Sequence, residues 1–278
     1  MEKFAIFGNP IHHSKSPIIH KLFAKQIGLQ IEYRKKLVFK NQLQKKIHQF
    51  FYSENGNGLN ITTPLKGYAY KIVHKLTNRA KLCGSINVIK LKNKMLFGDN
   101  MDGIGLIMDL KKYLITQKKI IKILIIGAGN ASRSAIVSLL QYPVKIILVN
   151  RTYDKSKKIS YLFHKTKKIQ SKRIEEVQKP EYDIIINATS SGMFGKVPKI
   201  SPKIFDKFVF CYDMFYKYLE NTPFIKLARK YGVLQHSDGI GMLVWQAAFS
   251  FKFWTGKMPN AKSILKEIRE KNKRLFNP

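Results

Sequence analysis

Short apolar runs alternate along the chain with longer segments whose apolar residues recur at helical spacing. The clearest run, at 120–126 (IIKILII), is rich in β-branched residues and ends abruptly at Gly127-Ala128-Gly129. A run of this kind, bounded by glycine, is typical of a strand buried on both faces of a parallel sheet. Because the residues after the glycines favour a helix, the stretch predicts a buried strand, a tight turn and a helix N-terminus.

The same alternation continues through the second half of the chain. It predicts strands at 144–149, 183–187 and 207–213 and helices at 132–141, 154–168 and 223–231. Strands that alternate with helices form parallel βαβ units, so we expect a doubly wound sheet. Two further helices are predicted at 239–255 and 260–274. No strand follows them, and we expect them to pack back onto the first part of the chain.

The first hundred residues show a second α/β pattern. It predicts strands at 3–7, 31–38, 58–62 and 85–91 and helices at 16–28, 40–52 and 65–74. Residues 98–103 (GDNMDG) predict a turn, after which apolar residues at helical spacing predict a helix at 103–115. We place the domain boundary at this turn. The prediction is therefore an α/β protein with one domain at 1–101 plus 239–278 and a Rossmann domain at 102–238.

Gly127 and Gly129 form the G-x-G of a dinucleotide-binding turn. In this motif the first glycine makes the turn, and the second lets a pyrophosphate approach the backbone amides at the helix N-terminus. The third position of the motif is Ser132, which is small but is not glycine. The same turn also joins strands and helices that bind no ligand, so the motif alone leaves cofactor binding open.

The end of the next predicted strand distinguishes the two nicotinamide dinucleotides. An acidic residue there favours NAD, because it bonds the ribose 2′-hydroxyl, whereas a basic residue favours NADP. The strand at 144–149 runs into Asn150-Arg151-Thr152, and Lys155 follows. Arg151 can hold a phosphate with two parallel hydrogen bonds, and Lys155 adds a point charge. An arginine at this position also arises by chance in so basic a chain, but its neighbours favour NADP.

The formal net charge is +34, from 51 Lys and Arg against 17 Asp and Glu. Such a charge is typical of proteins that bind nucleic acid. The lysines are scattered through nearly every segment, however, and no stretch interleaves basic and exposed aromatic residues. We therefore keep a basic nucleic-acid-binding protein only as a remote alternative.

The sequence does not support a metal site or a membrane-spanning segment. Cys83 and Cys211 lie far apart, and the seven histidines show no zinc-like spacing, so we expect no metal. No apolar run reaches the roughly 18 residues that span a bilayer, and no signal-peptide layout is visible. We expect a cytoplasmic protein with no membrane partner.

Several segments resemble, in order along the chain, the motifs of the shikimate dehydrogenase family. They are GNPIHHSKSPIIH (8–20), GLNITTPLK (58–66), GDNMDGIGL (98–106), GAGNASR (127–133), NRTYDK (150–155), INATSSGM (186–193), YDMFY (212–216), TPF (222–224) and DGIGMLVWQAA (238–248). The resemblance implies an N-terminal substrate-binding domain, a Rossmann NADP-binding domain and C-terminal helices that return to the first domain. It also implies NADPH-dependent reduction of 3-dehydroshikimate to shikimate, on the route to chorismate and aromatic amino acids.

The resemblance further implies roles for particular residues. Lys66 and Asp102 would be the catalytic pair. The substrate carboxylate would be held by Ser14 and Ser16 with Tyr216 nearby, and the substrate hydroxyls by Thr62, Asn87 and Gln246. The implied cofactor-binding residues are Gly127, Ala128, Gly129, Asn130, Ala131, Asn150, Arg151, Thr152, Lys155, Thr189, Met214, Gly239 and Met242.

The residue types suit a hydride transfer to a ketone. The alkoxide that develops must be stabilised and protonated, and Lys66 can donate to it while Asp102 orients the hydroxyl. Whether Lys66 or the coupled pair is the formal acid stays open. Plainer readings also exist: Lys66 as a solvated helix-start lysine, Asp102 as a helix N-cap, and Ser14 with Ser16 as turn formers before Pro17.

Three residues depart from the family pattern. Met101 stands where the family has Thr, Asn130 replaces a glycine, and Lys155 replaces an Arg. Asn tolerates a left-handed φ better than most residues, so the turn can survive. One alternative function is a quinate/shikimate dehydrogenase with relaxed cofactor use, against which the absence of an acid at Asn150-Arg151-Thr152 argues. The oligomeric state is not determined by the sequence, and a homodimer is left open.

Overall fold

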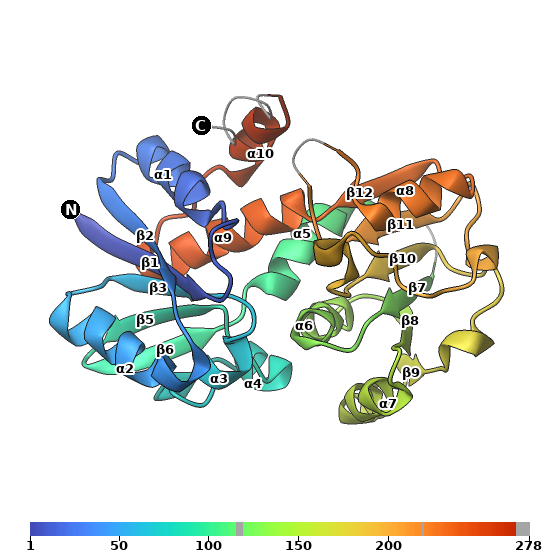
Figure 1. The fold of residues 1–278 in the computed structure, drawn as a ribbon, viewed down its shortest axis with the longest axis horizontal. Coiled ribbons are helices and arrows are strands. Elements are labelled where there is room, and N and C mark those ends of the chain that lie inside the picture. The colour runs from blue at the N-terminus through green and yellow to red at the C-terminus, as the bar shows by residue number, and fades with distance from the viewer. Residues whose placement is uncertain (115–118, 218–219, 271–278) are drawn as a thin grey trace. The chain divides into compact units, whose positions relative to one another are not determined.

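The computed structural model describes residues 1–114, 119–217 and 220–270. The chain forms two compact units, one of residues 1–105 with residues from 243 onward and one of residues 106–242. The divisions fall within two helices, α5 (Asp102–Leu114) and α9 (Ile240–Thr255). We describe each unit by itself and call them the first and the second unit (Figure 1).

The first unit has a mixed six-stranded sheet in the order β2-β1-β3-β5-β6-β4. β1 pairs in parallel with β2 and β3, whereas β5 is antiparallel to both β3 and β6. Its strands are β1 (Glu2–Gly8), β2 (Ile31–Leu37), β3 (Gly58–Ile61), β4 (Lys75–Leu76), β5 (Val88–Lys92) and β6 (Met95–Asp99). Its first helices are α1 (Ser16–Gln26), η1 (Lys40–Gln42), α2 (Leu43–His48), η2 (Gln49–Ser53), α3 (Lys66–Ala69) and α4 (Asn78–Cys83).

Two predictions for the first unit were wrong. Residues 98 and 99, which were predicted as part of a turn, are the end of strand β6. This strand was not predicted. It pairs with β5 in a hairpin whose turn is Asn93-Lys94. Both residues have positive φ, of 51° and 58°, as the tightest hairpin turns require, but the pair lacks the usual Asn-Gly signature. The helix predicted at 65–74 ends at Ala69. From His74, whose N–H donates to the Leu96 carbonyl at 3.0 Å, the chain instead pairs with β6.

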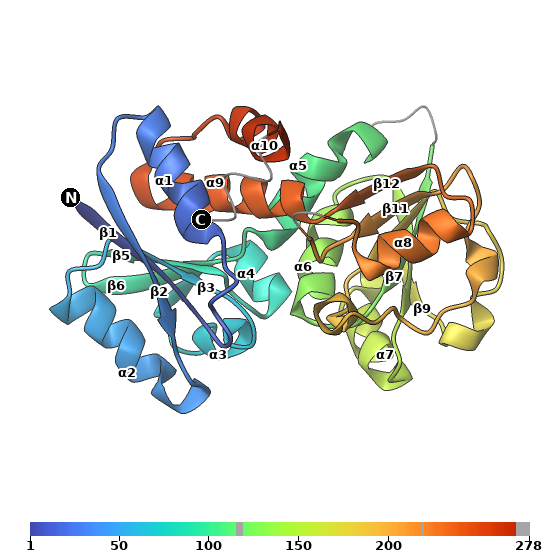
Figure 2. The ribbon, with the colours of Figure 1, turned by 45° about the horizontal axis from the view of Figure 1, so that its top comes forward.

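The two C-terminal helices pack on the first unit, as predicted. Trp254 of α9 stacks on Phe4 with ring centroids 4.8 Å apart, and its indole N–H donates to the Ile89 carbonyl at 3.0 Å. α9 lies alongside α1 in both views (Figures 1 and 2). α10 (Ala261–Glu270) also contacts α1, and the predicted helix residues 271–274 lie outside the described part of the chain.

The second unit contains the predicted doubly wound sheet, with the order β12-β11-β10-β7-β8-β9 and every pairing parallel. Its strands are β7 (Ile121–Ile126), β8 (Val144–Val149), β9 (Ile169–Ser171), β10 (Ile184–Asn187), β11 (Phe210–Asp213) and β12 (Gln235–Asp238). Its helices include α6 (Asn130–Leu139), α7 (Tyr153–Leu162), η3 (His164–Thr166), η4 (Ile174–Glu176), η5 (Ser191–Phe194), η6 (Pro202–Ile204) and α8 (Pro223–Lys230). The inner strands β7, β10 and β11 are almost wholly buried, which explains their apolar sequences.

Several elements of the second unit differ from the prediction. β11 begins at Phe210 rather than 207, because the Asp206 carboxylate accepts the N–H groups of Phe208 and Val209 and holds a turn there. The helix predicted at 154–168 ends at Leu162 and is followed by the short helix η3, after which Lys167 has a φ of 54°. The edge strands β9 and β12 were not predicted, because they are short and mostly polar.

The first unit contains a buried imidazole. His20 of α1 has no exposed surface and stacks on Tyr33 with ring centroids 4.7 Å apart and on Trp254 at 5.1 Å. Among the residues that the structure describes, neither ring nitrogen has a hydrogen-bond partner. Burial lowers the pKa of His20 to about 3, and the neighbouring Asn60 amide opposes this only in part.

We predict that His20 makes the stability of the protein fall in acid. The unfolded chain takes up a proton on His20 near pH 6.5, whereas the folded chain does not until about pH 3. Between pH 7 and pH 5 this should remove about 2 kcal/mol from the free energy of unfolding. Urea unfolding at both pH values checks it, with His20→Phe as the reference that keeps an aromatic ring. Equal pH dependence in the two proteins would contradict the prediction.

Candidate functional site

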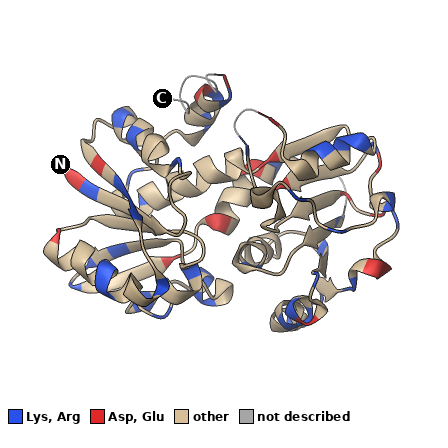
Figure 3. Cartoon of the chain, viewed as in Figure 1, with Lys and Arg blue, Asp and Glu red and all other residues tan. Residues whose placement is uncertain are grey.

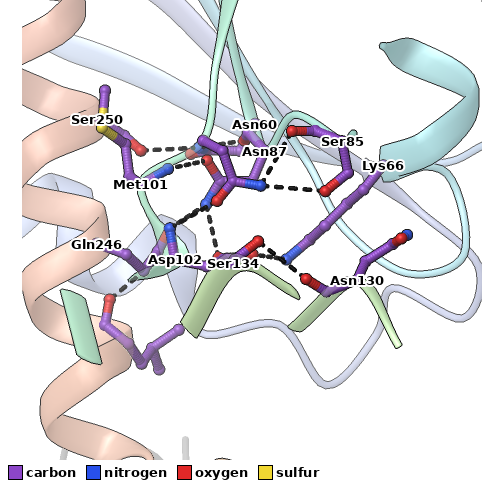
Figure 4. Close-up of polar contacts among 12 residues, drawn as sticks. Asn60, Lys66, Ser85, Asn87, Met101, Asp102, Asn130, Ser134, Gln246 and Ser250 are labelled. Carbon is purple, nitrogen blue, oxygen red and sulfur yellow. Dashed lines mark hydrogen bonds and ion pairs between the residues drawn. The ribbon is translucent and has the colours of Figure 1, made fainter. Parts of the chain in front are cut away.

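The first unit brings Lys66 and Asp102 together (Figure 4). Lys66 is the first residue of α3 and Asp102 the first of α5, and Lys66 Nζ lies 2.6 Å from Asp102 Oδ2. Their side chains are 17% and 6% exposed. The lysine is therefore not on a solvated helix face. The two groups form an ion pair that is largely shielded from water and suits proton transfer or hydrogen bonding to a ligand.

Asn87 connects this pair to the C-terminal helix α9. Its Nδ2 donates to Asp102 Oδ1 at 2.8 Å and to Gln246 Oε1 at 3.1 Å. Its Oδ1 accepts the Met101 N–H at 2.8 Å. Four of the predicted site residues (Lys66, Asn87, Asp102 and Gln246) thus form one hydrogen-bonded cluster, which we call the lysine–aspartate cluster. Both oxygens of Asp102 are engaged, so its carboxylate has one orientation.

Asp102 is the first residue of helix α5 and does not cap it. The Asp102 N–H donates to Asn100 Oδ1 at 3.1 Å, and Asn100 Nδ2 donates to the Ser85 carbonyl at 3.0 Å. The Asp102 carboxylate is bonded to Lys66 and Asn87. The reading of Asp102 as a simple N-cap is therefore wrong.

Tyr33 and Asn60 extend the hydrogen bonds from the cluster to Ser16. Asn60 Nδ2 donates to the Asn87 carbonyl at 3.0 Å and to Ser250 Oγ at 3.2 Å, and Asn60 Oδ1 accepts the buried Tyr33 hydroxyl at 2.7 Å. Burial raises the pKa of Tyr33, and a hydrogen bond with Ser16 opposes the rise. No role was predicted for Tyr33. Its position on the inward face of an alternating strand was the only signal.

The remaining predicted substrate residues are not members of the lysine–aspartate cluster. Ser14 Oγ lies 3.3 Å from Ser16 Oγ and accepts the Ser16 N–H at 3.4 Å, so these serines do form a turn before Pro17. Thr62 is half-buried after β3, where the absence of a side chain at Gly8 leaves room for its methyl group. Tyr216 belongs to the second unit and stacks on Phe215. Among the described residues, no hydrogen bond joins Thr62 to the lysine–aspartate cluster.

The glycine turn in the second unit follows β7 as predicted. Gly127 has a φ of +110°, and a Cβ there would lie 3.1 Å from the Ala188 carbonyl group, so both backbone conformation and space require glycine. Gly129 is exposed, and a Cβ there would meet nothing within 4 Å. Asn130 does not adopt the left-handed φ considered for it, because it is already the first residue of α6.

This turn fits a pyrophosphate. The first amides of a helix have no intrahelical partner, and the N-cap of α6 is a glycine, which has no side chain to accept them. The space beside Gly129, the half-exposed residues Ala128 and Ala131 and the positive end of the α6 dipole together suit an anion.

The end of β8 presents basic side chains. Asn150 Oδ1 accepts the Ala128 N–H at 3.1 Å, and its Nδ2 donates to the Thr152 carbonyl at 2.8 Å, so this amide holds the loop next to the glycine turn. Arg151, Thr152 and Lys155 are exposed. Within the described ranges, neither Arg151 nor Lys155 makes an ion pair, so both charges are available to a phosphate.

The other predicted cofactor residues lie at the carboxyl ends of β10, β11 and β12. The Thr189 hydroxyl and N–H both donate to Asn187 Oδ1, at 2.7 and 3.1 Å. Gly239 lies against the Met214 carbonyl, where a Cβ would not fit, and its N–H donates to the Phe215 carbonyl at 3.1 Å. Met242 follows in α9 and is buried. Ligands of open α/β sheets bind at this edge.

Among the described residues, no group of three or more His, Cys, Asp or Glu side chains can hold a metal ion. In the same part of the chain, no helix has the length and apolar character needed to cross a membrane. Lys and Arg residues occur on many elements of both units rather than on one alone (Figure 3).

A parallel doubly wound sheet with a glycine turn after an inner strand defines the dinucleotide-binding class of α/β fold. Three family models match the chain: a shikimate dehydrogenase substrate binding domain at 6–89, a shikimate / quinate 5-dehydrogenase at 109–194, and a shikimate 5′-dehydrogenase C-terminal domain at 239–269. The chain therefore belongs to the shikimate dehydrogenase family, as its sequence motifs predict, and is an oxidoreductase with a Rossmann fold.

Solved structures agree with this assignment. A shikimate dehydrogenase in complex with NADP+ is 31% identical with a TM-score of 0.88, and the match covers 99% of this chain and 96% of that chain. An Ael1 enzyme from Pseudomonas putida is 32% identical with a TM-score of 0.87 and coverage of 96% and 98%. A shikimate 5-dehydrogenase from Listeria monocytogenes, in complex with shikimate and NAD, is 28% identical with a TM-score of 0.84 and coverage of 96% of each chain.

We predict that the backbone carrying Asp102 depends on a buried ion pair just before it. Asp99 is 3% exposed and is held by Arg79 (Nη2–Oδ2 2.5 Å) and by the Thr77 hydroxyl at 2.6 Å. Arg79→Ala leaves this carboxylate buried without its cation. Because Arg79 is partly exposed, the free energy of unfolding should fall by about 2–3 kcal/mol, somewhat less than for a fully buried pair.

Chemical denaturation measures the loss for Arg79→Ala. The matched control is Arg34→Ala, which removes the same side chain from an exposed pair with Glu32. That variant should lose well under 1 kcal/mol. Similar losses in the two variants would show that Asp99 does not need its cation.

Proposed function

We propose that this protein is an NADP-dependent shikimate dehydrogenase that reversibly reduces 3-dehydroshikimate to shikimate. The observation that carries the proposal is the lysine–aspartate cluster, a Lys66–Asp102 ion pair oriented by Asn87 and Gln246. The unit that contains it matches the family's substrate-binding model over 6–89. Support also comes from relatives whose structures hold shikimate or NADP+.

The cluster suits the reduction of a ketone beside a ring hydroxyl. The cofactor, when bound, supplies the hydride that reaches the carbonyl carbon. Lys66 Nζ donates a hydrogen bond to the carbonyl oxygen, which becomes an alkoxide, and this donor is worth most where water is largely excluded. A proton from the Lys66–Asp102 pair then completes the hydroxyl.

The remaining substrate residues would bind and orient. We assign the substrate hydroxyls to Asn87, Gln246 and Thr62. We assign the carboxylate to the Ser14 and Ser16 hydroxyls, with Tyr216 as a further contact. The Ser16–Tyr33–Asn60–Asn87 hydrogen bonds support this assignment, since they fix the serines and the lysine–aspartate cluster in one framework.

For the cofactor we assign the pyrophosphate to the turn at 127–131 and the 2′-phosphate to the loop after β8. Arg151 and Lys155 are exposed without ion pairs in the described ranges, and Asn150 and Thr152 add polar groups. We assign the nicotinamide end to Thr189, Met214, Gly239 and Met242. The preference for NADP over NAD rests on Arg151 and on the absence of an acidic residue at Asn150-Arg151-Thr152, directly after β8.

The activity assay that tests the proposal follows reduction of NADP+ with shikimate and with quinate, and then repeats both with NAD+. We expect the highest kcat/KM for shikimate with NADP+. Comparable rates with quinate or NAD+ would establish the broader quinate/shikimate dehydrogenase instead. Activity on neither acid would overturn the proposal.

We predict that Lys66→Ala lowers kcat by about 10³-fold, because it removes the group that donates to the developing alkoxide. Shikimate should still bind, since its carboxylate is assigned to other residues. Steady-state kinetics and a shikimate titration check the two statements. The control is Lys71→Ala, which removes an exposed lysine from the turns that follow α3. Near-normal turnover in Lys66→Ala would refute the catalytic assignment.

We predict that Arg151→Ala raises the dissociation constant of NADP+ about 10- to 100-fold, because charge-assisted hydrogen bonds to the 2′-phosphate are lost. The dissociation constant of NAD+ should not change. Calorimetric titration of both dinucleotides measures this. Lys157→Ala, an exposed lysine on α7, serves as the charge control. An equal loss for both dinucleotides would place Arg151 elsewhere than at the 2′-phosphate.

A further inference from the structure

The second unit contains a buried carboxylate that none of the roles above includes. Asp213, the last residue of β11, has no exposed surface. Its Oδ1 accepts the Asn187 amide at 3.0 Å and the Phe215 N–H at 3.1 Å, and its Oδ2 accepts the Thr222 hydroxyl at 2.6 Å. Asn187 and Thr222 are also fully buried. One carboxylate therefore joins the end of β10, the segment after β11 and the beginning of α8.

Asn187 extends these hydrogen bonds to two residues assigned to the cofactor. Its Oδ1 accepts both donors of Thr189, and its backbone carbonyl accepts the Met214 N–H at 2.9 Å. The Asn187 amide can present its oxygen to Thr189 only while its nitrogen faces an acceptor, which is Asp213. The carboxylate thus determines which way Asn187 points.

The same loops lie against two glycines, Gly127 and Gly239, that have no room for a side chain. A Cβ on Gly127 would lie 3.0 Å from the Thr189 methyl group, and a Cβ on Gly239 would meet the Met214 carbonyl. Packing this close leaves the loops after β10 and β11 little tolerance for displacement. A shift of Asn187 would therefore move Thr189 relative to the glycine turn.

Burying an ionised carboxylate costs free energy unless a cation or hydrogen bonds compensate for the lost hydration. No ion pair is found for Asp213 among the residues described. Asp238 of β12, its in-register neighbour, is the charged group that faces it, whereas β10 and α8 present the neutral Asn187 and Thr222. Burial raises the pKa of Asp213 to about 6, although its hydrogen bonds oppose the rise. Above this pH the ionised group can accept all three hydrogen bonds, and below it a proton occupies one of the acceptor sites.

We propose that Asp213 is a positioning residue for cofactor binding, which holds the Thr189 and Met214 loops through Asn187 and Thr222. The inference rests on the proposed function, since it takes the second unit as the NADP-binding unit. Asp213 acts through its neighbours and is not assigned a contact with the cofactor.

The experiment is calorimetric titration of NADP+ into wild type and Asp213→Asn between pH 5 and pH 8. At pH 8 the variant should bind about 10-fold more weakly or worse, since an amide cannot accept from all three donors. On acidification, wild type should lose affinity through pH 6 more steeply than the variant. The 2′-phosphate of NADP+ also titrates near pH 6, and the variant provides the reference for that proton.

Three further variants separate positioning from general damage. Thr222→Val removes one donor and should weaken NADP+ binding, whereas Thr222→Ser keeps the hydroxyl and should restore it. Asp206→Asn alters a carboxylate at the other end of β11, where it caps a turn, and should leave the NADP+ affinity unchanged. Thermal unfolding and circular dichroism confirm that each variant is folded.

The outcomes distinguish the two proposals. Absence of NADP+ binding by wild type would overturn the proposed function. NADP+ binding by wild type, with the same affinity and a parallel pH profile in Asp213→Asn, would overturn the role of Asp213 alone. Weakened binding in both Thr222→Val and Thr222→Ser would also contradict it, because the hydroxyl would then not be the group that matters.

Discussion

The side-chain amide of Asn87 is the group on which the polar arrangement of the first unit depends. It donates to Asp102 and Gln246 and accepts from the Met101 backbone, so it joins β5, the loop before α5 and α9. Only an amide offers two donors and an acceptor on so short a side chain. A carboxylate at the same place would face Asp102 with like charge, and an apolar residue would leave buried groups unsatisfied at about 1–3 kcal/mol each. The Asn87 amide therefore contributes both to the orientation of the Lys66–Asp102 pair and to the packing of helix α9.

A different constraint organises the second unit. Parallel strands place their carboxyl ends along one edge, where the backbone leaves the sheet and its polar groups lose their ladder partners. Asn150, Asn187 and Asp213 stand at the carboxyl ends of β8, β10 and β11 and bond the loops that follow. The side-chain amides of Asn150 and Asn187 therefore hold loops in place, as the buried carboxylate of Asp213 does. The glycines at 127 and 239 then allow these loops to pack closely.

Much of this arrangement was predictable from the sequence, and the reasons for the failures are local. Apolar strands such as Ile121–Ile126 and Val144–Val149 are buried on both faces, and their composition identifies them. The polar edge strand Gln235–Asp238 and the Asn93-Lys94 hairpin lack such a signal, because pairing with a neighbour rather than local preference creates them. The family motifs led to Lys66 and Asp102, but nothing in the spacing showed that the Asn100 side chain would accept the Asp102 N–H. Tyr33 was missed for a related reason, since a tyrosine on an inward strand face is usually only core.

The two polar networks differ in whether their side chains are exposed to a ligand. Every residue of the lysine–aspartate cluster belongs to the first unit, and every residue bonded to Asp213 belongs to the second. The first network includes a cation 17% exposed beside a carboxylate, so it retains access to a ligand and can exchange a proton with it. The second has no exposed member among Asp213, Asn187 and Thr222, so it can only hold backbone in place. In this protein, burial therefore separates the group proposed to act on substrate from the group proposed to act through geometry, although both depend on an aspartate bonded to an asparagine.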